Sequence, residues 1–242
     1  MNRLGHRWTF AVLGAMLLAG CSASPGRPRA NSETLAPNDV LDFGTLYADN
    51  CSACHGAEGK GGAAIALADP VYLAIVDDAT LHKIISGGLS GTAMPAFAQS
   101  AGGMLTDKQV GVIASNIRSV WGKPGILDGA NAPSYLPKTA GEVSRGAAAF
   151  KTYCASCHGP DGRGGAKGSN ITDDSFLALV NDQALRTMVI VGRPELGAPD
   201  WRGDDPGKPM SEQEVTDVVA WLASQRAPNP GQPYSVPINT QH

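Results

Sequence analysis

The strongest constraint in this sequence is a unit that occurs twice, each time with two cysteines and a histidine in a fixed order. The segment CSACHGAEGKGG begins at Cys51, and CASCHGPDGRGG begins 103 residues later at Cys154. From Leu67 onward the two copies align at an offset of 104 residues, as far as Phe97 over Trp201. Self-similarity of this kind indicates two homologous domains in tandem.

Both copies read Cys-x-x-Cys-His, which is the spacing that attaches a c-type haem. Two thiols one helical turn apart add to the vinyl groups of the macrocycle, and the adjacent imidazole coordinates the iron. The sequence therefore predicts two covalently attached haem c groups, held by Cys51, Cys54, His55, Cys154, Cys157 and His158. Zinc binding and a redox dithiol are the alternatives for such cysteine pairs, although two pairs in separate domains would not share one tetrahedral site.

The pattern around each motif predicts helices. Helical stretches are expected over residues 40–50 and 142–153, directly ahead of the first cysteine of each pair. Thr106 with Gln109 and Ser211 with Glu214 have the spacing of capping boxes, and the helices that follow carry apolar residues on one face to about residues 120 and 224. Glycine-rich loops and a short helix lie between. The fold class predicted is all-α, with two tandem haem domains.

Composition supports a globular protein with an unusual core. Charged residues make up 17% of the chain and the net charge is -3, so the basic excess that a nucleic-acid partner requires is missing. Aromatic residues make up only 6%, which leaves few of the large side chains that usually fill cores. A covalently held macrocycle would supply the missing apolar volume in domains this small.

The first twenty residues are predicted to be an export signal. Arg3 and Arg7 precede an uncharged apolar run, residues 8–20, that is too short to span a bilayer comfortably. The run ends in Leu-Ala-Gly-Cys, which resembles a bacterial lipobox and predicts lipidation of Cys21. The alternative is ordinary signal cleavage next to an incidental cysteine. We therefore expect an exported bacterial lipoprotein, held by its lipid on the periplasmic or outer side of a membrane.

The sequence divides into segments of different character. We expect a signal peptide over 1–20, a tether over 21–37, haem domains over 38–123 and 141–226, a Pro/Gly-rich linker over 124–140, and a Pro-rich tail over 227–242.

The two repeats resemble the class I cytochrome c family. In that family a few helices surround a haem, with Cys-x-x-Cys-His at the end of the first helix and a methionine on a later loop as the second axial ligand. The segment Thr92-Ala93-Met94-Pro95-Ala96-Phe97 is similar to the family's ligand loop. The resemblance therefore implies that Met94 binds the first iron.

The second domain departs from that pattern. The alignment places Ala198 where Met94 stands, and an alanine cannot ligate iron. Met188 aligns with Ile84 inside a short apolar helix and is interpreted as a core residue. Met210 precedes an N-cap and is interpreted as half of a hydrophobic staple, with the sixth position of the iron as its alternative role. Otherwise the second iron is five-coordinate, or held by water or a residue from elsewhere.

The function predicted is that of a membrane-anchored dihaem cytochrome c, which passes single electrons between a respiratory or dehydrogenase donor and a periplasmic or oxidase acceptor. An enzyme or small-ligand binder with an open second iron is one alternative, of which a peroxide-type enzyme is an example. A fixed subunit of a larger redox complex is another. The expected partners are redox proteins, and the oligomeric state is left open.

Overall fold

The computed structural model describes residues 35–203, 207–228 and 230. The predicted signal peptide, Cys21, and most of the predicted tether and tail lie outside these residues. The chain divides into a first unit that ends at Asp39 and a second that begins at Val40. The first contributes a short 3-10 helix, η2 (Pro37–Asp39), and the second contains both repeats. No helix in the described part of the chain is long and apolar enough to cross a membrane.

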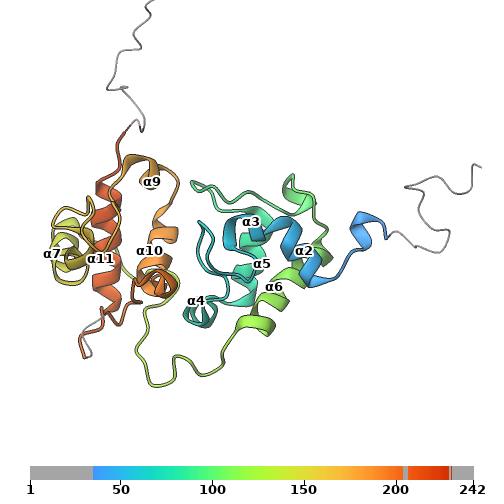
Figure 1. Ribbon diagram of the computed structural model, residues 1–242, viewed down its shortest axis with the longest axis horizontal. Coiled ribbons are helices and arrows are strands. Elements are labelled where there is room, and N and C mark those ends of the chain that lie inside the picture. The colour runs from blue at the N-terminus through green and yellow to red at the C-terminus, as the bar shows by residue number, and fades with distance from the viewer. Residues whose placement is uncertain (1–34, 204–206, 229, 231–242) are drawn as a thin grey trace, which may run out of the picture. The chain divides into compact units, whose positions relative to one another are not determined.

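The first repeat is a set of short helices closed by a longer one (Figure 1). Their order is α2 (Phe43–Asn50), α3 (Ser52–His55), α4 (Pro70–Ile75), α5 (Asp78–Gly87), the 3-10 helix η3 (Gln99–Ala101) and α6 (Asp107–Trp121). Four of the α-helices begin at a side chain that accepts backbone N–H groups: Asp42, Asp69, Asp77 and Thr106. These caps satisfy amides that have no partner inside the helix, which fixes where each helix starts.

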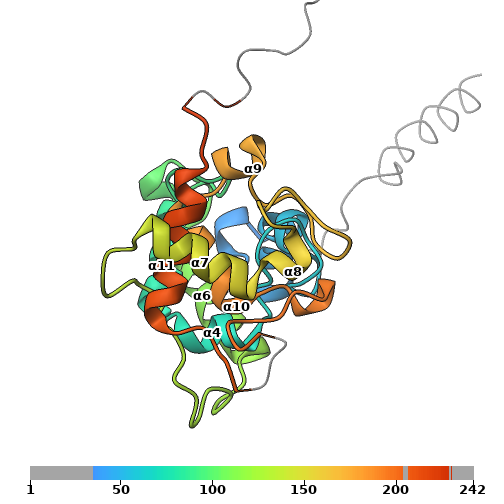
Figure 2. The same ribbon diagram turned by 90° about the vertical axis from the view of Figure 1, so that its left-hand side faces the viewer.

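The second repeat has the same helical order. Its elements are α7 (Val143–Tyr153), α8 (Ala155–His158), α9 (Asp174–Ala178), α10 (Asp182–Val191), the 3-10 helix η4 (Pro194–Leu196) and α11 (Glu212–Ser224). Helix α7 leads into α8 and packs along α11 (Figure 2). Gly146 permits this contact, because a Cβ there would lie 2.0 Å from the carbonyl oxygen of Asp217.

The predicted fold class is confirmed. The described residues contain no strand, and their only β-type pairings are two isolated bridges, Ala98 with Leu105 and Arg193 with Ala198. Both predicted capping boxes are present. The helices expected from residues 40 and 142 begin instead at Phe43 and Val143, because the preceding acidic side chains serve as N-caps.

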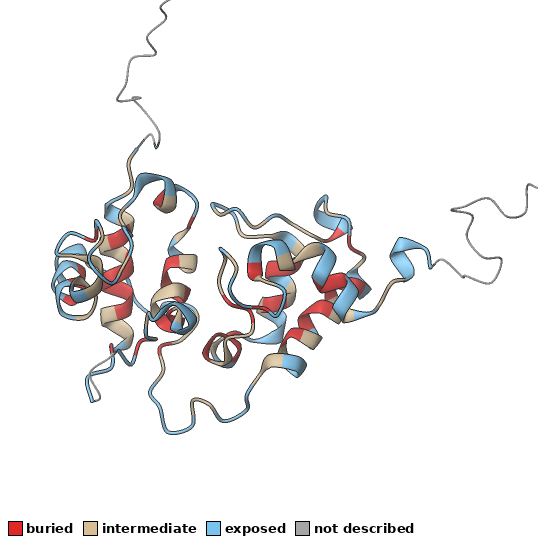
Figure 3. Cartoon of the chain, viewed as in Figure 1, coloured by how far each residue is buried: buried red, intermediate tan, exposed pale blue. Residues whose placement is uncertain are grey.

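The long closing helices bury the faces that their spacing predicts. Val110, Ile113 and Ile117 of α6 are at most 1% exposed. Val215 and Val218 of α11 are fully buried, and Leu222 is nearly so. Figure 3 shows buried positions along both helices, beside exposed ones in α6 and mostly half-buried ones in α11. Each domain is thus organised around the inner face of its last helix.

The second half of the predicted linker is bound to the second domain. The guanidinium of Arg186 on α10 is 2% exposed and donates to the carbonyl oxygens of Ser134 and Tyr135 at 2.8 to 3.1 Å. Its charge is balanced by Glu212 at 2.5 Å, and the same carboxylate accepts the Ser134 N–H at 2.8 Å. Ser134 and Tyr135 of the predicted linker are therefore in direct contact with the second domain.

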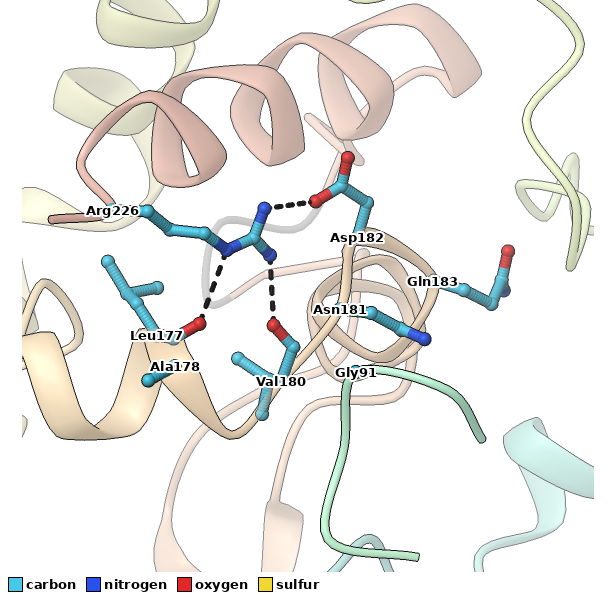
Figure 4. Close-up of a pocket in the computed structure, with 8 residues that line it drawn as sticks. All are labelled: Gly91, Leu177, Ala178, Val180, Asn181, Asp182, Gln183 and Arg226. Carbon is cyan, nitrogen blue, oxygen red and sulfur yellow. Dashed lines mark hydrogen bonds and ion pairs between the residues drawn. The ribbon is translucent and has the colours of Figure 1, made fainter. Parts of the chain in front are cut away.

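In each domain an arginine within or just after the last helix binds backbone carbonyls and one carboxylate of the two preceding short helices and the turn between them. In the second domain Arg226 donates to the carbonyl oxygens of Leu177 and Val180, at 3.2 and 2.9 Å, and pairs with Asp182 (Figure 4). In the first domain Arg118 binds the aligned groups, which belong to Leu73, Val76 and Asp78. The two arginines do not occupy aligned positions, so the sequence repeat conceals this shared contact.

Candidate haem-binding sites

The Cys-x-x-Cys-His segments occupy the same corner of the fold in both domains. Cys51 closes α2 and His55 ends α3, and the His55 N–H donates to the Cys51 carbonyl at 3.0 Å. The N–H of His158 donates to the carbonyl of Cys154 at the same distance. Because residues four apart on a helical turn share a face, the first thiol and the imidazole of each motif lie on one side of the turn.

No disulfide joins the four cysteines of the two motifs. Cys54 is exposed, and the other three are half-buried. Burial raises the pKa of Cys51 and of Cys154 to about 11, so these two thiols are neutral near pH 7. Within the described residues, no group of three or more His, Cys, Asp or Glu side chains is placed to hold a metal ion.

A backbone carbonyl fixes the orientation of each imidazole. Nδ1 of His55 lies 2.8 Å from the carbonyl oxygen of Ile65, and Nδ1 of His158 lies 2.8 Å from that of Ser169. A carbonyl only accepts hydrogen bonds, so Nδ1 carries the proton and Nε2 keeps its lone pair. Burial also lowers the pKa of His55, which favours this neutral form. Both rings are therefore arranged as axial ligands are, with one nitrogen available to iron.

The loops of Met94 and Ala198 have matching backbone contacts. The Met94 carbonyl accepts the Leu89 N–H at 3.1 Å, and the Ala198 carbonyl accepts the Arg193 N–H at 2.9 Å. These donors and acceptors are related by the repeat offset of 104 residues. Met94 is half-buried and packs against the core. The second loop therefore presents a methyl group at the position where the first carries a thioether.

The two loops diverge after their prolines. The Phe97 N–H donates to the Ile85 carbonyl at 3.1 Å, whereas the Trp201 N–H donates to the Ile190 carbonyl at 3.0 Å, one residue beyond the aligned acceptor. Trp201 is 2% exposed, while Phe97 is only half-buried. The larger ring thus fills more of the core of the second domain.

The remaining sulfurs of the second domain belong to packed side chains. Met210 is 6% exposed, and its N–H donates to the Trp201 carbonyl at 2.8 Å. It directly precedes the cap Ser211, the position from which a hydrophobic staple to Val215 is expected. Met188 lies within α10, is half-buried and packs against the core.

Two polar contributions to these sites have no signal in the sequence. The carbonyls of Ile65 and Ser169 are backbone groups, so their residue types do not indicate their role. The hydroxyl of Tyr47 donates to the carbonyl of Gly56 at 2.8 Å, directly after His55. The repeat identifies Tyr47 only as the equivalent of Phe150, without a function.

In a comparison with known proteins, both domains match the same protein family. Residues 38–115 and 141–222 match the family described as cytochrome C oxidase, cbb3-type, subunit III. The cbb3-type cytochrome c oxidase subunit CcoP of Azospirillum sp. (strain B510) is 31% identical over 142 residues, which are 52% of this chain and 43% of that subunit. The cytochrome bc1 complex cytochrome c subunit of Corynebacterium efficiens is 26% identical over 240 residues, which are 91% of this chain and 78% of that subunit.

The two matched segments contain the two Cys-x-x-Cys-His motifs and leave out the whole of the predicted linker, residues 124–140. The chain spans less than half of the Azospirillum subunit, so only part of that protein is represented here. The prediction of a c-type cytochrome with two covalent haem groups is confirmed by these matches. The chain belongs to the family of cytochrome c oxidase, cbb3-type, subunit III, and it is a dihaem c-type cytochrome.

Proposed function

We propose that the chain passes single electrons between a respiratory or dehydrogenase donor and a periplasmic or oxidase acceptor. Haem c, when bound, supplies the one-electron chemistry of its iron. The observation that carries the proposal is the carbonyl on Nδ1 of His55 and of His158, which leaves Nε2 of both rings available. The names of the two relatives, both subunits of respiratory complexes, support it.

The cysteines and the histidine of each motif have different roles in binding the cofactor. Cys51 with Cys54, and Cys154 with Cys157, would attach the macrocycles, and the histidine of each motif would ligate the iron. Their shared helical turn and oriented imidazoles fit this group. Met94 would be the second ligand of the first iron, and its thioether would favour reduced iron.

A second candidate function, small-ligand binding, is favoured by Ala198. Its side chain has no donor atom, and Met210 is packed in the core rather than exposed at the loop. We propose that the second iron has an open sixth position that accepts a small neutral ligand. Ala198 also supplies no polar distal group, which argues against peroxide chemistry at this position.

Replacing both Cys51 and Cys54 by alanine is expected to remove one covalent haem and to unfold the first domain. A domain of this size depends on the macrocycle for its apolar core. Mass spectrometry of the intact chain would show the loss of one haem, and circular dichroism would show a loss of helix. The matched variant, Cys154→Ala with Cys157→Ala, should act only on the second domain. Two covalent haems in either variant would contradict the attachment residues.

Replacing Cys21 by serine is expected to release the protein from the membrane, or to leave an uncleaved precursor. We expect this release because we propose that a lipid on Cys21 anchors the protein after residues 1–20 have been removed. Fractionation of cells after a high-salt wash measures the outcome. A cleaved protein that stays in washed membranes would show instead that a partner complex holds it.

A further inference from the structure

The hydroxyl of Tyr47 reaches the turn that follows the first axial histidine. Tyr47 lies on α2, is 3% exposed, and donates to the Gly56 carbonyl at 2.8 Å. Gly56 follows His55 and has φ of 84°, a left-handed conformation that suits glycine. A Cβ there would lie 1.8 Å from the carbonyl oxygen of Lys60. The turn is folded tightly back on itself, and the Tyr47 hydroxyl holds its first carbonyl.

Ring packing fixes the position of this hydroxyl. The ring centroids of Phe43 and Trp121 lie 5.7 and 5.1 Å from that of Tyr47. Trp121 also covers the loop itself, because a Cβ on Gly59 would lie 2.9 Å from its ring. Burial raises the pKa of Tyr47 to about 12, so the phenol stays protonated at physiological pH. Tyr47 is therefore a buried donor with a defined direction.

The loop that Tyr47 holds also carries the acceptor for His55. After Gly56 the chain returns towards the motif, where the Ala64 N–H donates to the Cys54 carbonyl at 2.9 Å. The next residue, Ile65, supplies the carbonyl that lies 2.8 Å from Nδ1 of His55. The position of this carbonyl depends on how both ends of the loop are held, and Tyr47 holds the end next to the histidine.

The second domain lacks this hydroxyl. Phe150 is 1% exposed at the aligned position, and a Cβ on Gly162 would lie 3.5 Å from the tip of its ring. The ring thus points towards the equivalent loop but offers no donor. His158 is also more exposed than His55, which is 8% exposed. The second domain shows that the fold accepts phenylalanine here, which makes Tyr47→Phe a conservative test.

We propose that Tyr47 is a positioning residue for His55: through Gly56 it keeps the Ile65 carbonyl on Nδ1 and thereby lowers the reduction potential of the first haem. A well-placed acceptor on Nδ1–H makes the imidazole a more basic ligand, and a more basic ligand stabilises oxidised iron. The inference rests on the proposed function in one respect, the ligation of the first iron by His55.

The test uses Tyr47→Phe in the full chain with both haems attached. Proton NMR is expected to show the Nδ1–H of His55 exchanging with deuterium about fivefold faster, as for the loss of one ordinary hydrogen bond. Redox titration is expected to show a higher potential for the first haem and no change at the second. The direction is diagnostic, because mere loosening of the domain would admit water, stabilise oxidised iron and lower the potential.

The reciprocal variant, Phe150→Tyr, provides the matched control. The Ser169 carbonyl already lies 2.8 Å from Nδ1 of His158 without a hydroxyl, so this variant should leave both potentials unchanged. Unchanged exchange and potential in Tyr47→Phe, or a lowered first potential, would overturn the positioning role. Absence of a paramagnetic shift on the His55 ring in the unmodified protein would overturn its ligation of iron and the positioning role together. If the His55 ring shows a paramagnetic shift, and Tyr47→Phe changes neither the exchange rate nor the potential, only the role of Tyr47 is overturned.

Discussion

Carbon monoxide is expected to bind the reduced second haem and to leave the first unchanged. Met94 fills the sixth position of the first iron in our assignment, whereas Ala198 offers the second iron only a methyl group. The two residues hold aligned positions, since their carbonyls accept the N–H groups of Leu89 and Arg193 respectively. Absorption spectra of the reduced protein, with and without the gas, measure the result. A high-spin component in the spectrum without the gas should accompany it.

Ala198→Met is the complementary change. It should abolish carbon monoxide binding and raise the potential of the second haem, because the Ala198 carbonyl accepts the Arg193 N–H as the Met94 carbonyl accepts the Leu89 N–H. The unmodified protein would contradict the open site if it bound no carbon monoxide and showed two low-spin irons. Met210→Ala would then identify or exclude the nearest remaining sulfur in the sequence, although its burial argues for a packing role.

The same asymmetry sets an expected direction of electron flow. A second iron with His158 alone, or with water opposite, should have a lower potential than an iron held by His55 and Met94. Electrons would then rest on the first haem and occupy the second only under strong reduction. We therefore expect the second haem to face the donor and the first to deliver outward, which a stepwise reductive titration can test.

Met94→Ala is expected to leave both haems attached but to lower the potential of the first haem on the order of 0.1 V or more. The loss of a thioether removes a ligand that favours reduced iron, within a span of about 0.8 V that axial ligands cover in haem proteins. The weak sulfur-to-iron absorption band should disappear as well, while the covalent links to Cys51 and Cys54 remain.

Met104→Ala is the matched control for this change. Met104 belongs to the same domain as Met94 but its side chain is 80% exposed, so its loss should alter neither the absorption band nor the potential of the first haem. An unchanged redox titration of Met94→Ala would refute Met94 as the axial ligand.

Much of the architecture could be predicted because its signals are local and occur twice. The capping box at Thr106 and Gln109 follows from side chains three residues apart, and it is present as expected. The apolar face of α6 follows from helical spacing, and Ile113 is fully buried on it. The predicted helix starts differ from the observed starts by up to three residues. Whether Asp42 caps the first helix or belongs to it depends on its backbone conformation, which the sequence does not give.

The contacts that join distant segments could not be predicted in the same way. Arg226 and Arg118 bind aligned carbonyls from positions that do not align, so comparison of the two repeats gives no indication of either contact. Arg186 binds the carbonyl of Ser134, a residue assigned to the linker on composition alone. The composition of a segment indicates how much apolar surface it can bury, but it does not indicate which helix the segment will contact.

The amino-acid order alone indicates the chemistry of this protein, because haem attachment requires two thiols and an imidazole at fixed spacing, as in Cys51, Cys54 and His55. It also determined the asymmetry between Met94 and Ala198, since a methyl group has no electron pair to donate. The orientation of the two imidazoles, in contrast, depends on the folded chain. The carbonyl on His55 and the hydroxyl of Tyr47 come from different elements, and a hydrogen bond exists only once the fold has brought donor and acceptor within about 3 Å.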